Sequence, residues 1–193
     1  MMKRLISVLA MLSMLAGCAS VSRDECLAGD WAAIGERDGA SGRVGEVQFA
    51  RHVTACAKVE ITPERGTWEQ GYARGLATYC TPHTGLREGE AGNPYRNVCP
   101  AGTEGQFLQG YDLGQSAYRQ RARIQEIGRE ISQLQSRNSA LSDDTQSDAE
   151  ALAAQREWHA NQSQIMLLRL EQSMARAQLL RIEREIRAFR AAL

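Results

Sequence analysis

Two histidines and two cysteines stand at spacings that a zinc site tolerates. His52 and Cys56 are four positions apart, and Cys80 and His83 are three apart. Imidazole and thiolate groups at such spacings are common ligands of tetrahedral zinc. However, 23 residues separate Cys56 from Cys80, and disulfide formation would consume both thiolates. We therefore expect no metal and no cofactor.

The sequence patterns for other kinds of catalytic site are equally weak. A cysteine nucleophile activated by histidine needs a free thiolate, which paired cysteines do not supply. Asp30 is interpreted as a helix cap and Asp38 as part of a turn, and no spacing singles out two carboxylates for acid–base work. The sequence shows no serine–histidine–aspartate arrangement, phosphate loop or nucleotide fingerprint. We expect a protein that is not an enzyme.

The first residues determine the expected location. Lys3 and Arg4 precede the apolar run Leu5–Leu15, which is too short to cross a bilayer as a helix. Leu15-Ala16-Gly17-Cys18 resembles the lipobox of bacterial lipoproteins, in which the cysteine is lipidated and becomes the first mature residue. This predicts a signal peptide over residues 1–17 and a lipidated tether over 18–29, with the bilayer as partner of Cys18. A plain secretory signal cleaved near Ala19 is the alternative.

The remaining cysteines agree with export. Cys26, Cys56, Cys80 and Cys99 form an even set, which is typical of an oxidising compartment. Four cysteines allow three connectivities, and we favour Cys26–Cys56 with Cys80–Cys99 because sequential pairing closes two local loops. Such a loop stabilises a small domain by about 3 kcal/mol in the chain-entropy model.

An internal repeat lies in the aromatic-containing part of the chain. Trp68–Tyr79 aligns with Phe107–Tyr118, and both copies carry an aromatic residue, glycine, tyrosine, glycine and tyrosine at matching positions. A weaker third echo begins at Trp31. In a helix Gly71 and Gly75 fall alongside the aromatic face, so we expect close helix packing, with a tyrosine-lined ligand groove as the alternative.

Turn and cap residues complete this region. Thr62-Pro63-Glu64 predicts a helix that begins with a threonine cap and a proline in its first turn. Prolines and glycines between Cys80 and Cys99 predict a loop closed by the disulfide. The predicted domain, 30–118, is small, helical and stapled by disulfides, with glycine-rich loops.

The last part of the chain, 119–193, predicts an antiparallel coiled-coil hairpin. Apolar residues recur at steps of three and four on both sides of Ser142–Asp148, a segment of turn and capping residues. Counting back from this turn places Ile131 near Trp158 and Ile124 near Ile165. The longer second helix leaves Leu179–Leu193 to lie against the globular part or another protomer. Asn138, Asn161 and Gln172 fall on the seam, where polar residues fix register. The fold class is mainly α.

Residues 26–114 resemble the bacterial lipoprotein family catalogued as domain of unknown function 2799. The resemblance rests on an ordered set of short motifs: Cys26 with Asp30-Trp31, Gly35-x-x-Asp38-Gly39, His52-x-x-x-Cys56, Thr62-Pro63, Tyr72-x-x-Gly75, Tyr79-Cys80, Tyr95-x-x-Val98-Cys99-Pro100 and Gly110-Tyr111-x-x-Gly114. It implies an envelope lipoprotein and brings no catalytic residues, since none are established for the family.

The net charge and the expected location limit the functions that we expect. The formal net charge is zero, which argues against nucleic acid as a partner. Ala19 differs from the aspartate that retains lipoproteins in the inner membrane, so we expect an outer-membrane lipoprotein facing the periplasm. Its hairpin would bind an envelope protein or a second copy. The alternative is a small-ligand or metal-binding domain, with or without hydrolytic activity, that uses Tyr72, Tyr79, Tyr111, His52 and His83.

Overall fold

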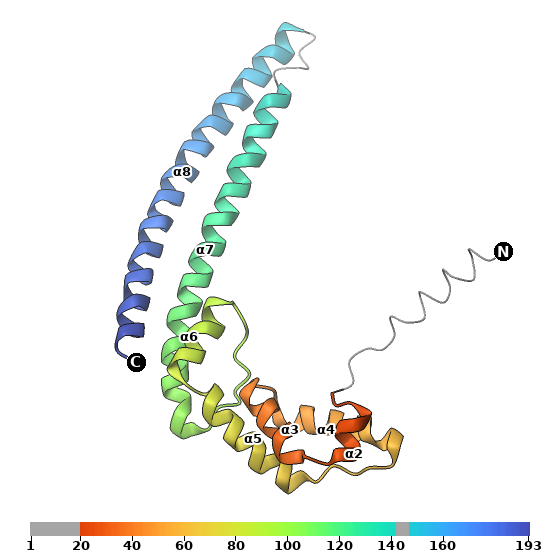
Figure 1. Cartoon of the computed structure of the whole chain (residues 1–193). Coiled ribbons are helices and arrows are strands. Elements are labelled where there is room, and N and C mark those ends of the chain that lie inside the picture. Colours follow the sequence, from red (N-terminus) through yellow and green to blue (C-terminus); the bar gives the residue numbers. More distant parts are fainter. Residues whose placement is uncertain (1–19, 142–146) are drawn as a thin grey trace, which may run out of the picture. The chain divides into compact units, whose positions relative to one another are not determined.

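The computed structural model describes residues 20–141 and 147–193, and all regular elements in these ranges are helices. The predicted signal peptide and Cys18 lie outside the described residues. No helix of the described ranges combines the length and apolarity needed to cross a membrane. The elements are α2 (Arg23–Ala28), α3 (Trp31–Ala40), α4 (Gly45–Cys56), the short 3₁₀ helix η2 (Ala57–Val59), α5 (Arg65–Tyr79), α6 (Pro82–Glu90), α7 (Ala101–Leu141) and α8 (Asp148–Ala191) (Figure 1).

These helices form two compact units. Unit 1 takes in the described residues up to Cys80 together with Arg96–Pro100, and unit 2 takes in Thr81–Tyr95 and Ala101–Leu193. A boundary therefore falls inside the predicted domain 30–118, and α7 continues from that domain into the hairpin as one helix of 41 residues. The expected mainly α fold is confirmed.

Unit 1 is built on α3 and α5, which pack along each other, with α2 and α4 completing its core. The residues of the predicted tether that the structure describes contain α2, whose Ser22 and Glu25 cap each other's backbone reciprocally. Asp30 caps α3 as expected, its side chain accepting from Ala33 N. The core residues are Val21, Cys26, Trp31, Ile34, Phe49, Cys56 and Trp68.

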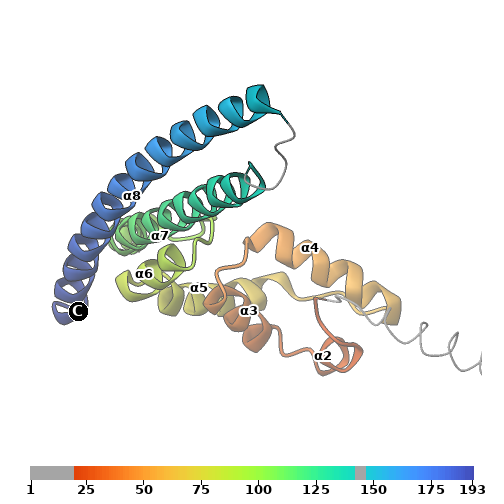
Figure 2. The ribbon, with the colours of Figure 1, turned by 90° about the horizontal axis from the view of Figure 1, so that it is seen from above.

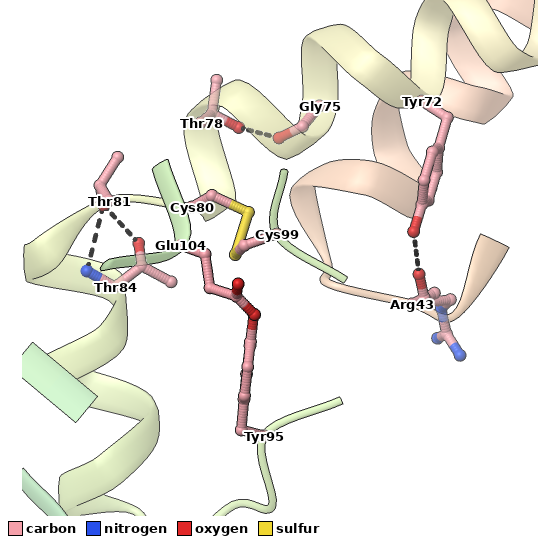
Figure 3. The surroundings of a disulfide bond; sticks show 10 residues. All are labelled: Arg43, Tyr72, Gly75, Thr78, Cys80, Thr81, Thr84, Tyr95, Cys99 and Glu104. Carbon is pink, nitrogen blue, oxygen red and sulfur yellow. Dashed lines mark hydrogen bonds between the residues drawn. A yellow bond between two sulfur atoms is a disulfide. The ribbon is translucent and has the colours of Figure 1, made fainter. Parts of the chain in front are cut away.

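Both disulfides have the connectivity favoured from the sequence. Cys26 is bonded to Cys56 across a separation of 30 residues, and Cys80 to Cys99 across 19. The first bridge joins Cys26, before α3, to Cys56, before α5. The second joins Cys80, before α6, to Cys99, before α7. The second bridge follows the end of α5 directly (Figure 3).

Two local predictions were wrong. Pro82–Glu90 is a helix, α6, and not a loop: Thr81 caps it, Pro82 occupies its first turn, and its glycines pack against α7. The helix after Thr62 begins at Arg65 with Glu64 as its cap, because the Glu64 carboxylate accepts from Gly66 N and Thr67 N.

Unit 2 contains the predicted hairpin of α7 and α8 (Figures 1 and 2). Its apolar seam includes Ile127, Ile131, Leu134, Ile165 and Leu168. The end of α8 lies against the globular part of this unit, as one of the two expected arrangements had it. Leu86 and Ala117 pack there with Ile186, and Arg190 pairs with Glu90 at 2.7 Å.

The predicted register of the hairpin was wrong by about one heptad. Gln172, and not Ile165, lies opposite Ile124, whose carbonyl oxygen accepts from its side-chain amide at 3.3 Å. Trp158 is 42% exposed, whereas Ile131 packs in the seam with Ile165. Counting from the turn failed because the seam sets the register. Asn161 donates to Asn138 across it at 2.8 Å.

Candidate functional site

A buried carboxylate lies at the centre of unit 1. Asp38, in the last turns of α3, is 3% exposed. One of its oxygens accepts from Gln48 at 3.2 Å, and the other accepts from the Trp68 indole N–H at 3.1 Å. The prediction of a turn at Asp38 was wrong. Since a buried charge is costly unless it is hydrogen-bonded, these donors are what permit a carboxylate here.

His52 continues this network toward the start of the chain. Its side chain, on α4, is 0% exposed, and its Nε2 lies 2.7 Å from Asp38 Oδ2. Because a carboxylate only accepts hydrogen bonds, Nε2 carries the proton. Its Nδ1 lies 2.8 Å from the hydroxyl oxygen of Ser20. Ser20 itself is only partly buried.

Ser20, His52 and Asp38 therefore stand in the order of a nucleophilic triad. The sequence alone shows no such arrangement; the fold brings the three side chains together. His52 is 32 positions from Ser20 and 14 from Asp38, and Ser20 lies in the predicted tether. The sequence therefore contains no local motif that joins them. Chemically, this line of groups can fasten residue 20 to the helix pair, or it can raise the nucleophilicity of the Ser20 hydroxyl.

Beside this network, α3 and α5 touch through glycines. A Cβ built on Gly71 would lie 2.8 Å from the carbonyl carbon of Ala32, and one built on Gly75 would lie 2.6 Å from Ala40 N. From the other side, a Cβ on Gly39 would lie 2.8 Å from Leu76 N. Ordinary carbon contacts are about 3.5–4.0 Å. The helix backbones are thus in direct contact, and the predicted close helix packing is what the structure shows.

Tyrosines close the two ends of this contact. The Tyr72 ring stacks on Trp68 at 4.8 Å, and its hydroxyl donates to the Arg43 carbonyl at 2.5 Å (Figure 3). Burial raises the pKa of Tyr72 above its ordinary value. Tyr79 is buried with its ring against Gly42, whose backbone has a φ of 59°. A side chain at position 42 would meet both the ring and a strained backbone.

Unit 2 repeats the arrangement with α6 and α7. A Cβ on Gly110 would lie 2.9 Å from Leu86 N, and one on Gly114 would lie 2.6 Å from Glu90 N. Tyr111 donates to the Asn93 carbonyl at 2.7 Å, as Tyr72 does to Arg43. The counterpart of α3 is α6, so the echo at Trp31 is not a third copy. It is the partner helix of the first.

The five residues proposed for ligand contact do not share one unit. Tyr72, Tyr79 and His52 belong to unit 1, whereas His83 and Tyr111 belong to unit 2. Tyr79 packs against Gly42, whereas the hydroxyls of Tyr72 and Tyr111 donate to backbone carbonyls. His52 is fully buried. His83 is exposed at the start of α6.

The zinc ligands considered from the sequence are engaged otherwise. Cys56 and Cys80 are both in disulfides. Within residues 20–141 and 147–193, no group of three or more histidine, cysteine or acidic side chains is placed to hold a metal ion.

Comparison with protein families gives one match. Residues 30–116 match the family model described as "Protein of unknown function (DUF2799)". The chain belongs to this family. The DUF2799 match covers both glycine-packed helix pairs and ends within α7. No curated protein matches the chain, and no solved structure does.

Proposed function

We propose that this protein is a lipoprotein of the bacterial cell envelope, anchored in the outer membrane through acylated Cys18. Its hairpin binds a protein partner in the periplasm. The anchor is supported by the basic, apolar and small-residue pattern that ends at Cys18. The two disulfides also support export, because such bonds persist in oxidising compartments.

One observation carries the binding role: α8 exposes large apolar side chains on the face opposite its seam. At 100° per residue, Leu170 points away from the buried Ile165 and Leu168. Contiguous exposed apolar patches mark interaction sites, and methionine adapts to irregular partners. The stripe consists of Met166 (67% exposed), Leu167 (68%), Leu170 (58%) and Met174 (53%).

Photocrosslinking in cells tests this role. A photoreactive amino acid replacing Leu170 is expected to give a discrete crosslinked product, because an apolar partner surface would cover the stripe. The matched position is Arg176, exposed on the same helix but turned about 120° around its axis from Leu170, which is expected to give little product. A crosslink to a second copy of the chain would assign the stripe to self-association. Absence of any product specific to Leu170 would refute the role.

Hydrolysis is the second candidate, favoured by the alignment of Ser20 with His52 and Asp38. An activated serine reacts with fluorophosphonates. If Ser20 is a nucleophile, the probe labels the chain and Ser20→Ala abolishes the labelling. The leading proposal expects none. Metal binding is tested by zinc analysis and a free-thiol count on protein purified from the periplasm. If the cysteines bind zinc, the protein should contain zinc and four titratable thiols.

A further inference from the structure

The described residues of unit 1 begin at Ser20, two positions after the predicted lipid site. Val21 is 3% exposed and packs in the core with Cys26 and Trp31. The preceding residue, Ser20, is hydrogen-bonded to the enclosed His52. Ser20 and Val21 are thus both held at the core, and α2 occupies half of the predicted tether 18–29.

This placement has a consequence for the anchored protein. Only Ala19 stands between Ser20 and Cys18. Consecutive Cα atoms are 3.8 Å apart, so the Cα of Cys18 lies within about 8 Å of that of Ser20. If Cys18 carries the acyl chains, this part of unit 1 lies at the headgroup layer of the membrane.

A hollow of about 670 Å³ opens beside Val21. Its lining includes Arg23 and Leu27 of α2, and Lys58 and Val59 of η2. Both basic side chains are exposed, and neither has a recorded ion pair among the described residues. Leu27 is 57% exposed. Glu60 is the acidic residue of the lining.

We propose that this hollow seats the phosphate-bearing headgroup of an anionic phospholipid in the membrane that holds Cys18. The proposal rests on the lipoprotein function proposed above. The two cations match a phosphodiester, and basic residues within a Debye length of an anionic leaflet are attracted to it. Leu27 and Val59 supply apolar surface toward the acyl boundary.

The scarcity of lysine makes the test specific. The chain has two lysines, Lys3 in the predicted signal peptide and Lys58 in the hollow. In a triacylated lipoprotein the α-amine is blocked, which leaves Lys58 as the one reactive amine. Its acetylation by a charged, water-soluble reagent can then be followed by mass spectrometry on the full mature protein.

The rate of Lys58 acetylation is compared between protein in detergent and protein in vesicles of phosphatidylethanolamine with phosphatidylglycerol. Lys58 is expected to react at least about fivefold more slowly in the vesicles, the factor that one basic residue gains at an anionic surface. The control is Arg43→Lys, an amine before the other end of α4, whose rate is expected to change less than about twofold. Arg23→Glu is expected to abolish most of the protection of Lys58, whereas Arg43→Glu should leave it intact.

Two failures are distinguishable. A mature protein whose N-terminus lacks acyl chains would refute the proposed lipoprotein. An acylated protein in which Lys58 and the control amine react alike, or in which Arg23→Glu leaves protection unchanged, would refute the headgroup site alone.

Discussion

The exchange Gly71→Ala measures how much unit 1 depends on contact between the backbones of α3 and α5. The added methyl group would lie 2.8 Å from the Ala32 carbonyl carbon and closer still to its oxygen. That is about 1 Å inside an ordinary contact. Because the obstructing atoms are backbone in a helix, no side chain can turn aside, and the two helices must separate.

The expected magnitude combines two opposing effects. Overpacking costs about 1–3 kcal/mol, and a clash with backbone belongs at or above the upper end. Alanine gains about 1 kcal/mol over glycine in a helix interior. We expect a net loss of about 2 kcal/mol in the free energy of unfolding, which lowers Tm by about 4–8 °C in a chain of this size.

Thermal and urea unfolding followed by far-ultraviolet circular dichroism, with the disulfides intact, measures this loss. The matched control is Gly105→Ala in α7, where an added Cβ meets nothing within 4 Å. It is expected to stabilise by about 0.5–1 kcal/mol. If Gly71→Ala were as stable as the wild type, the helices could not be in contact at this glycine.

Three further outcomes follow from hydrogen-bonded polar side chains. Asn161→Leu is expected to cost about 1–3 kcal/mol because it leaves Asn138 buried without its partner, whereas the double exchange to leucine should recover the loss in urea unfolding; equal costs for both variants would contradict this. Asp38→Asn should destabilise by about 2–4 kcal/mol and change the Trp68 emission, while Trp68→Phe, which removes one donor, should cost less; a neutral Asp38→Asn would show that the carboxylate is not needed. The Ser22 backbone N–H, and then Arg37, lower the pKa of Glu25 below its ordinary value. Its stabilising contribution is therefore present above about pH 4.5 and lost as pH falls through the folded pKa. The stability advantage over Glu25→Gln, about 0.5 kcal/mol at neutral pH, should shrink steadily below pH 4.5; a difference that stays constant with pH would contradict the assignment.

Much of the fold could be predicted because its signals are local. The heptad steps of the hairpin and the cap at Asp30 depend on residues close in sequence, and the structure has both. The disulfide pairing followed from loop length alone. The glycines at 71 and 75 indicated close packing because a helix keeps such residues at a cost in stability.

The features that could not be predicted, α6 and the hairpin register, depend on tertiary contacts that the local sequence does not reveal. The sequence of α6 carries a proline and two glycines, which predict a loop, yet the same glycines bring it onto Gly110 and Gly114 of α7. In the same way, the hairpin register follows from the pairing of Asn138 with Asn161 and not from the turn.

Comparison of the two repeats bears on what the buried polar network does. In the second repeat Phe107 occupies the position of Trp68 and supplies no N–H. Glu88 occupies the position of Asp38 and accepts from Asn93 at 2.8 Å. No described helix of that repeat corresponds to α4, which carries His52. Nevertheless α6 and α7 make the same glycine contact. The helix pair therefore does not need the polar network. In the first repeat this network has one visible consequence that the second lacks, which is to bind Ser20, two positions after the proposed lipid anchor, to the core.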